Sequence, residues 1–256
     1  DVINTQGEEY SPVLTSNERT ILFCGKYRGD NIGGAKVNNE DIFVSHKDKN
    51  GKWEKAKLDT RFSTDHNEAP LSISVDGNKI VIFRDGVICE ANKTSEGWSD
   101  FKEMDYTINQ NEWQSDACLT SDGRAILFAA ENSDNYNTNL EHSYHGEFMH
   151  ASDIYVVYYD DNDSLVGPVN LGHTINTRYS DRSPYLHADM KTLYFSSNGH
   201  GGLGHRDIYM SRRLSDTCWT CWSEPVNIGK EINSERDEIE YKVNMSGDKA
   251  YYHRNY

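Results

Sequence analysis

The densest group of metal-ligating side chains in the sequence consists of three histidines and two glutamates. His142 and His145 are separated by two residues, His150 follows, and Glu141 and Glu147 flank them. Imidazoles combined with carboxylates suit zinc, copper or nickel. Their spacing belongs to a loop, however, and not to one face of a helix as in zinc proteases. Either the loop binds a metal ion or its histidines are solvated. We favour the second interpretation, which predicts no metal site and no cofactor.

A second polar segment, residues 199–204, is rich in glycine. It contains His200, and His205 follows it directly. A phosphate-binding glycine loop leads into a helix whose amide groups face the phosphate. This segment instead leads into a strand-like run at Asp207, so it predicts a turn that uses glycines with positive φ. The histidines of the two segments are our predicted binding residues: His142, His145, His150, His200 and His205.

Carboxylates recur where inner strands are expected to begin. Two such groups at asymmetric positions could act as the acid and base of a glycosidase. Several of these acids occupy equivalent positions of an internal repeat, which is typical of hydrogen bonds within each repeat. No nucleophile can be paired with a base, so we predict no catalytic residue. The acids are Glu8, Glu9, Glu68, Asp116, Asp181, Glu238 and Glu240.

The five cysteines fall into two groups. Three lie in apolar, strand-like runs, where cysteine serves as a small hydrophobic residue: Cys24, Cys89 and Cys118. Cys218 and Cys221 form a Cys-Trp-Thr-Cys segment. A redox pair of this spacing needs a helix N-terminus, which is not expected here, and a four-cysteine zinc site lacks its second pair. The two residues form either a disulfide at a loop tip or two thiols.

An internal repeat positions all of these groups. Five segments align on a turn followed by an apolar run, and each has the two-residue alternation of a β-hairpin. Asp76-Gly77 and Asp122-Gly123 are strong turn dipeptides. The five segments are SPVLTSNERTILF, APLSISVDGNKIVIF, DACLTSDGRAILF, SPYLHADMKTLYF and EYKVNMSGDKAYY.

Two further strands follow most of the hairpins. The third has the pattern Asp-Ile-aromatic, and a linker ending in Ile-Asn leads from the fourth to the next hairpin. The fourth strands are predicted at Trp53 to Leu58, Trp98 to Met104, Leu165 to Leu171 and Trp222 to Ile228. Four antiparallel strands repeated in this way make a propeller blade. We therefore predict an all-β fold, a five-bladed β-propeller of four-stranded blades whose last blade is incomplete. One domain, 1–256, would contain repeats at 1–62, 63–108, 109–175, 176–232 and a partial 233–256.

The charge and hydrophobicity of the chain argue against two classes of function, nucleic-acid binding and membrane insertion. The net charge is −15, from 41 acidic and 26 basic residues. A field of this sign repels nucleic acid and anionic lipid. No apolar run approaches the roughly 18 residues of a transmembrane helix. We therefore expect neither nucleic-acid binding nor a direct membrane span.

The fourth repeat resembles the TolB-like propeller repeat, a relative of the WD-type blade. The resemblance covers the whole chain and is weakest in the second repeat. It implies an excised part of a multidomain cell-envelope protein of Gram-negative bacteria, of the kind that carries OmpA-like or tetratricopeptide domains. The residues that carry it are Ser183-Pro184 to Ser197, residues 199–204, Asp207-Ile208-Tyr209, the Trp-Ser-Glu-Pro-Val-Asn-Ile-Gly run at 222–229, and Ile232-Asn233.

The resemblance implies a protein-interaction scaffold in the periplasm or at the outer membrane, linked to peptidoglycan or to the type IX secretion machinery. Its partners would be other envelope proteins, with glycan as a further ligand. The long loops between second and third strands, at 129–152 and 197–206, share one face with the linkers and are the predicted binding surface. The alternative is a carbohydrate-active propeller (a hydrolase, a polysaccharide lyase or a lectin) that uses acids or histidines of this face.

Overall fold

The computed structural model describes residues 2–111, 113–136, 143–144, 147–148 and 151–255. The chain forms two compact units, Asp1–Met104 with Lys242–His253, and Asp105–Tyr241 with Arg254–Tyr256. We call them unit 1 and unit 2.

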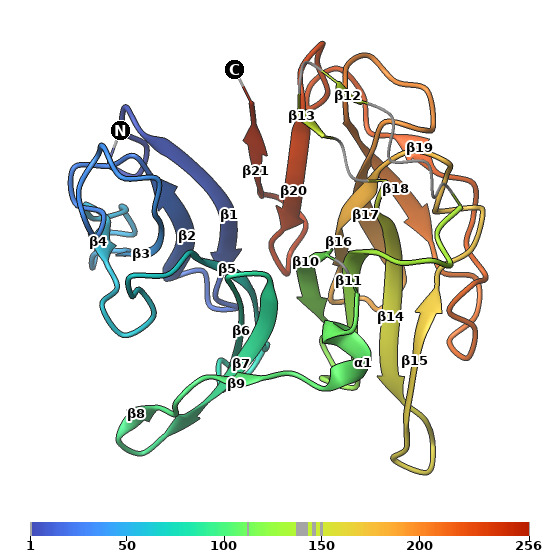
Figure 1. Ribbon diagram of the computed structural model, residues 1–256, viewed down its shortest axis with the longest axis horizontal. Helices are drawn as coiled ribbons and strands as arrows, with labels where there is room; N and C mark the ends of the chain where they lie inside the picture. Colours follow the sequence, from blue (N-terminus) through green and yellow to red (C-terminus); the bar gives the residue numbers. More distant parts are fainter. Residues whose placement is uncertain (1, 112, 137–142, 145–146, 149–150, 256) are drawn as a thin grey trace. The chain divides into compact units, whose positions relative to one another are not determined.

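Unit 1 contains two antiparallel sheets whose strands lie in chain order (Figure 1). The first sheet is β1-β2-β3-β4, and the second is β5-β6-β7-β8, in which β9 also pairs with β7. Strands β1, β2 and β3 contact β5, so the two sheets pack against each other. The strands are β1 (Glu8–Leu14), β2 (Thr20–Lys26), β3 (Glu40–His46), β4 (Lys57–Leu58), β5 (Glu68–Ile73), β6 (Lys79–Arg84), β7 (Val87–Thr94), β8 (Gly97–Trp98) and β9 (Lys102–Glu103).

Unit 2 repeats this arrangement. Its four-stranded sheets are β10-β11-β14-β15 and β16-β17-β18-β19, and β16 contacts β10, β11 and β14. The short helix α1 (Tyr106–Asn109) precedes the first sheet, and β12 (Ser143–Tyr144) pairs with β13 (Glu147–Phe148). The sheet strands are β10 (Trp113–Leu119), β11 (Ala125–Glu131), β14 (Asp153–Tyr159), β15 (Leu165–Asn170), β16 (Asp181–Leu186), β17 (Thr192–Ser197), β18 (Asp207–Arg212) and β19 (Val226–Asn227).

The last two strands, β20 (Glu238–Val243) and β21 (Ala250–Arg254), form a separate two-stranded sheet. In the part of the chain that the structure describes, there are thus four complete four-stranded sheets and one hairpin. The predicted all-β class and four-stranded antiparallel blades are confirmed. Four blades are shown and a fifth is not, so the five-bladed count stays a prediction, as does the assignment of 1–256 to one domain.

Each unit builds its core between two adjacent blades. In unit 1, Leu22 and Ile42 of the first blade pack with Ile80 and Ile82 of the second, and Phe62 of the connecting linker fills the space between them. In unit 2 the corresponding linker residue is Ile175, which packs in the cluster that contains Leu127, Ile154 and Phe195. The apolar residue of each linker is therefore what joins one blade to the next.

Turn chemistry explains the hairpins. Gly77, Gly123 and Gly247 have φ values of 70°, 69° and 75° in the turns between first and second strands. Side chains with a Cβ rarely adopt this region, which is why Asp-Gly and Gly-Asp mark these turns. The inner strands also carry bulges, and Ser11, Asp116 and other bulge residues have positive φ.

The fourth strands are shorter than the sequence predicted. Residues 98–104 were expected to form one strand, but Trp98 ends β8 and β9 begins at Lys102. Trp53 and Trp222 form only isolated bridges, to Lys47 and Arg213. A fourth strand has one hydrogen-bonded neighbour, so its pairing is easily interrupted; after Trp222, Pro225 also lacks an N–H group to donate.

Within the described residues, no helix is long and apolar enough to cross a membrane.

Candidate functional site at the strand ends

The Ile-Asn linkers after the third and fourth blades close these blades through a pair of hydrogen bonds. The Asn176 side chain accepts from the Ile154 amide at 2.8 Å and donates to the Ile154 carbonyl at 2.9 Å. Asn233 makes the same two bonds to Ile208, at 2.8 and 2.9 Å. In the first blade, Ser63 takes this part with Ile42. The linkers are thus fixed to the third strand of the blade that they leave.

A hydroxyl residue after four of the five linkers binds an acid four positions later, whereas the third repeat has Gln110 and Gln114 at these positions. The amide and hydroxyl of Thr5 donate to Glu9 at 3.1 and 2.6 Å, and those of Thr177 donate to Asp181 at 2.5 and 2.9 Å. The same pairing joins Thr64 to Glu68 and Ser234 to Glu238. The recurring acids therefore make hydrogen bonds within the repeat, as the sequence predicted.

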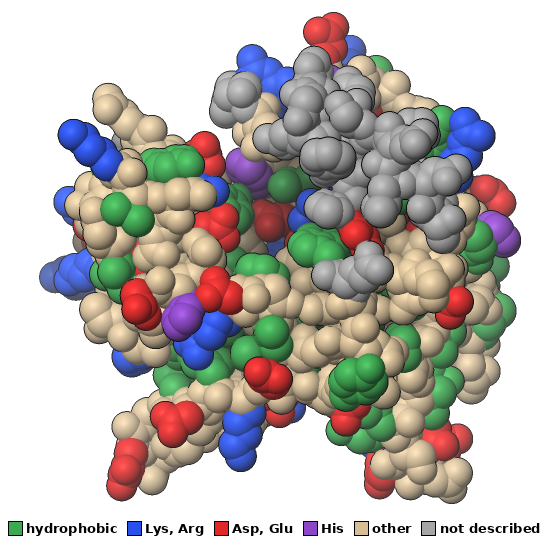
Figure 2. Space-filling model, in the orientation of Figure 1, with side chains coloured by type: hydrophobic (Ala, Val, Ile, Leu, Met, Phe, Trp, Pro, Cys, Tyr) green, Lys and Arg blue, Asp and Glu red, His purple; other side chains and the backbone are tan. Residues whose placement is uncertain are grey.

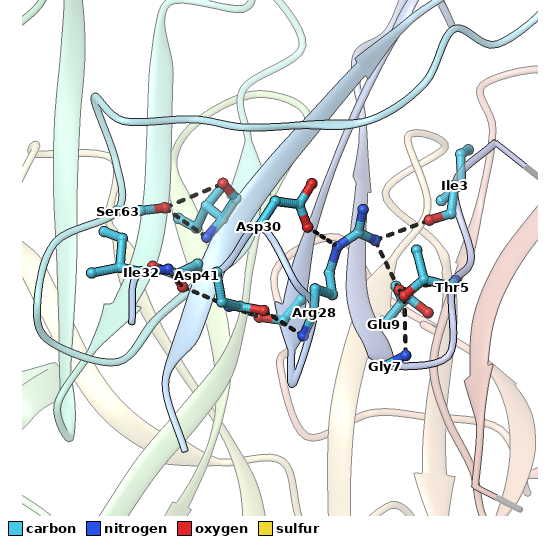
Figure 3. Close-up of polar contacts among 12 residues, drawn as sticks. Ile3, Thr5, Gly7, Glu9, Arg28, Asp30, Ile32, Asp41 and Ser63 are labelled. Carbon is cyan, nitrogen blue, oxygen red and sulfur yellow. Dashed lines mark hydrogen bonds and ion pairs between the residues drawn. The ribbon is translucent and has the colours of Figure 1, made fainter. Parts of the chain in front are cut away.

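In the first blade an arginine neutralises this acid. Arg28 is only 3% exposed, and its guanidinium lies 2.8 Å from Glu9 and donates to the Ile3 carbonyl at 3.0 Å (Figure 3). It also lies over the Phe43 ring, 4.2 Å from the centroid. The charge, the carbonyl and the ring together hold the guanidinium in one place, because a buried charge needs both a counter-charge and hydrogen bonds.

Two other repeats use the same solution. Arg84 lies 3.1 Å from Glu68, and Arg254 lies 2.7 Å from Glu238 and donates to the Ile232 carbonyl. Burial raises the pKa of Glu68, and the bonds from Thr64 and Arg84 partly offset that effect. These carboxylates therefore form ion pairs and hydrogen bonds with residues of their own repeats.

The fourth blade departs from this pattern. Asp181 is fully buried and has no arginine within ion-pair distance among the described residues. Instead, His200 Nε2 donates to the Ile175 carbonyl at 2.9 Å, and the His200 ring lies 5.2 Å from that of Tyr209. Burial raises the pKa of Asp181 to about 7, and the charge of Asp153 acts in the same direction against the bonds from Ser197 and Thr177.

Acids at the start of the third strands hold the loops before them. Asp41 accepts from the Ile32 amide at 2.9 Å (Figure 3), and Asp207 accepts from the Leu203 amide at 2.6 Å. Asp153 accepts from the Tyr136 amide at 3.2 Å, and burial raises its pKa to about 6. The Asp-Ile-aromatic pattern therefore reflects loop attachment.

The glycine-rich segment wraps around one of these acids. A Cβ at Gly202 would overlap the Asp207 carboxylate and meet the Tyr209 hydroxyl at 2.9 Å, so only glycine fits there. Gly201 has a φ of 73°, and the segment leads into β18. The structure confirms a turn and not a phosphate-binding loop.

The acids proposed for carbohydrate chemistry are engaged by their neighbours. Asp116 binds Arg182 at 2.7 and 3.0 Å and accepts from the Ser183 amide and hydroxyl. Burial alone would raise the pKa of Asp116, but the charge of Arg182 and these bonds hold it below its usual value. Glu240, at a bulge with a φ of 59°, adds its charge to the field around Arg182.

The structure describes two of the five predicted binding histidines, His200 and His205. His142, His145 and His150 lie outside the described residues. His205 lies 4.0 Å from Asp237, and its backbone amide donates to the Arg236 carbonyl. His200 and His205 therefore both fix loop structure, and their binding role stays a prediction. Among the residues that the structure describes, no three of His, Cys, Asp and Glu are grouped to hold a metal ion.

Unit 1 contains a cavity that the sequence did not predict. Its volume is about 390 Å³, within the range of small-ligand sites. Its lining comes from β1, β2, β21 and the linkers, which are far apart in the sequence, so no local motif marks it. Aromatic rings and one carboxylate dominate the lining: Ile3, Asn4, Glu9, Tyr10, Pro12, Ile21, Phe23, Trp53, Ala250, Tyr251 and Tyr252.

Comparisons with known proteins place the fold. No family model matches the chain. No curated protein sequence matches it. Among solved structures, TolB from Acinetobacter baumannii is similar over 82% of this chain, with 16% identity and a TM-score of 0.52. A TolB structure from Agrobacterium tumefaciens is similar over 98% of the chain, with 15% identity and a TM-score of 0.54. The fold is a β-propeller.

Other propellers of similar likeness are enzymes. The α-L-arabinofuranosidase from Lactobacillus brevis is similar over 97% of this chain and 84% of its own, with 12% identity and a TM-score of 0.56. This chain spans 42% of the Acinetobacter TolB and 71% of the Agrobacterium structure. At these identities the likeness shows the fold alone, and the propeller's function rests on its own residues.

Proposed function

We propose that this propeller is a non-catalytic protein-interaction scaffold. The observation that supports this most directly is that its recurring acids are bonded to neighbouring side chains of the protein. Glu9, Glu68 and Glu238 each bind an arginine and a Thr or Ser of their own repeat. Asp116 is held ionised by Arg182. A hydrolase needs an acid that has a raised pKa and can reach its substrate. These carboxyl groups are instead bonded to side chains of the protein.

The exposed side chains of unit 2 offer a surface for a partner. Tyr179 and Leu203, from a linker and from the glycine-rich loop, are exposed, and the Tyr136 ring stacks on His173 at 3.6 Å. Rigid blades fix the bases of these loops while their tips remain accessible. Figure 2 shows acidic and basic side chains interspersed on the face in view, as on a soluble interaction module.

We place this scaffold in the bacterial cell envelope, in the periplasm or at the outer membrane. The resemblance of the fourth repeat to TolB-like repeats and the likeness to TolB structures support this. Its partners would be envelope proteins, with links to peptidoglycan or to the type IX secretion machinery. We further propose that β20 and β21 are the first two strands of a fifth blade.

Binding to solubilised cell envelopes of the producing bacterium tests the proposal. A double variant, Tyr179→Ser with Leu203→Ser, should lose the co-purifying envelope proteins. The matched control, Leu165→Ser with Leu214→Ser, changes exposed residues at the opposite ends of unit 2 strands and should retain them. Equal losses in both variants would contradict a binding role for the loop face.

The aromatic cavity of unit 1 favours one second candidate, a glycan-binding or carbohydrate-active propeller. Rings such as Trp53 and Tyr251 can stack on sugar faces, and Glu9 and Asn4 can accept or donate hydrogen bonds. Titration with arabino-oligosaccharides and with peptidoglycan fragments, followed by Trp53 fluorescence, tests binding; Trp53→Leu is the control. Release of reducing ends from either polymer would establish catalysis and overturn the scaffold proposal.

A further inference from the structure

The Cys218–Cys221 segment lies between the third and fourth strands of the fourth blade. The two residues form a disulfide with a Cα–Cα distance of 5.5 Å and a sequence separation of three. Both are partly exposed, whereas Cys24, Cys89 and Cys118 are buried. A dissolved or protein-borne thiol can therefore reach this pair more readily than any other cysteine of the chain.

The turn does not depend on the disulfide for its shape. The Leu214 amide donates to the Cys221 carbonyl at 2.9 Å, and the Trp222 indole donates to the Trp219 carbonyl at 2.7 Å. Arg213 and Trp222 form a bridge at the base of the turn. A cross-link that closes so short a loop also restricts the unfolded chain less than a long-range one. The bond can open while the turn stays in place.

A buried guanidinium contacts the backbone of the Cys218–Cys221 turn. Arg213 is 7% exposed, donates to the Cys218 carbonyl at 3.1 Å and to the Asp216 carbonyl at 3.0 Å, and stacks on Trp219 at 3.6 Å from the ring centroid. Among the described residues it has no carboxylate at ion-pair distance. Burial lowers its pKa, with Asp216 acting in the opposite direction. A buried cation without a counter-ion favours an anion nearby.

We infer that Cys218 and Cys221 form a reversible thiol–disulfide site for a dithiol partner, with Arg213 stabilising the Cys218 thiolate. The sequence argued against a redox pair because no helix N-terminus is present; the structure supplies an arginine instead, which lowers the cost of a thiolate in the same way.

The exchange takes place in two steps. One thiolate of the dithiol attacks Sγ of Cys221, the Cys218–Cys221 bond breaks, and Cys218 leaves as the thiolate next to Arg213. The second thiolate of the dithiol then attacks the dithiol's first sulfur, which is bonded to Cys221 in the mixed disulfide, and Cys221 leaves as a thiolate. The protein gains two electrons and two protons, and the dithiol becomes a disulfide.

The first experiment uses dithiothreitol on the folded chain without denaturant, followed by alkylation and mass spectrometry. Two alkyl groups should appear, on Cys218 and Cys221, while Cys24, Cys89 and Cys118 stay unmodified, and oxidation should restore the bond. The thermal unfolding midpoint should change little. A disulfide that is reduced only when the protein unfolds would overturn the proposal.

The second experiment compares two single-cysteine variants of the pair. Cys221→Ser keeps Cys218, and Cys218→Ser keeps Cys221. The alkylation rate of Cys218 should reach half its maximum at a lower pH than that of Cys221, by about one pH unit, so that Cys218 carries up to about tenfold more thiolate at neutral pH. Arg213→Gln in the Cys221→Ser background should remove the difference, and Arg213→Lys should restore most of it. Equal pH profiles for the two thiols would overturn the role of Arg213.

Discussion

The first and fourth blades differ in how the charge of the acid at the start of the inner strand is balanced. In both, an acid at the start of the inner strand is bound by a threonine four residues earlier; Glu9 is partly buried and Asp181 is fully buried. In the first blade Arg28 neutralises Glu9. In the fourth, His200 occupies the contact to the linker carbonyl, and no cation of the described residues pairs with Asp181. A repeat can therefore keep its hydrogen bonds while it loses its charge balance, and in the fourth blade the pKa of this acid is raised to about 7.

Removing the guanidinium should cause the largest effect. Arg28→Met leaves the Glu9 carboxylate and the Ile3 carbonyl without their buried donor. We expect a loss of about 3–5 kcal/mol in the free energy of unfolding, as for other broken buried ion pairs. Urea unfolding measures it. The control is Lys79→Met, which breaks the more exposed pair with Glu90 and should cost less than about 1 kcal/mol. Equal costs would refute the special position of Arg28.

Neutralising the acid should have opposite signs in the two blades. Asp181 has a pKa of about 7 in the folded protein, against about 3.9 in the unfolded chain. Protonation of Asp181 therefore stabilises the folded state at low pH, and this stabilisation is lost as the pH rises through 7. Asp181→Asn keeps an acceptor for Thr177 and should gain about 2–4 kcal/mol at pH 8 and little at pH 4.

Glu9→Gln is the counterpart in the first blade. It leaves Arg28 without a counter-charge and should destabilise the protein at pH 8. Unfolding of both variants at pH 4 and pH 8 compares the two blades directly. Destabilisation by Asp181→Asn at pH 8 would mean that the carboxylate has a cationic partner in solution.

The loops before the third strands should differ in their tolerance of a methyl group. Gly202→Ala forces the loop away from Asp207, with an expected cost of about 1–3 kcal/mol. Gly29, in the corresponding loop of the first blade, has no atom within 4 Å of an added Cβ, so Gly29→Ala should change stability by less than about 0.5 kcal/mol. Thermal unfolding of the two variants is sufficient. A tolerant Gly202 would indicate that the Asp207 contact is not required.

Transferring the arginine should have the smallest effect. His200 and Arg28 each contact a linker carbonyl and lie over the aromatic residue of the third strand. His200→Arg should bring a cation toward Asp181, lower its pKa and gain about 1 kcal/mol at pH 8. The pH dependence of unfolding should flatten with it. An unchanged pH profile would show that the two positions are not equivalent.

The sequence predicted the blades because their signals are local. Hairpins follow from alternation and from Asp76-Gly77 or Asp122-Gly123, and the role of the recurring acids follows from their repetition. The short fourth strands were predicted too long, because pairing at a sheet edge depends on a single neighbour and not on composition.

The site was harder to predict because its contacts join distant residues. Arg28 reaches Glu9 across 19 positions, and nothing in either segment marks the pair. The state of Cys218 and Cys221 depends on how the turn brings them together, so spacing left two alternatives until the structure showed the disulfide. The aromatic cavity of unit 1 is assembled from strands at both ends of the chain.

The asparagine bonds that close the third and fourth blades also bear on the order in which the chain folds. Asn176 lies 22 residues after Ile154, and Asn233 lies 25 residues after Ile208. Each closing bond thus spans one short stretch of chain, which favours rapid formation. During synthesis, a blade whose first three strands have already emerged would remain open until its asparagine leaves the ribosome. Each linker would then act as the last step of one blade before the next begins.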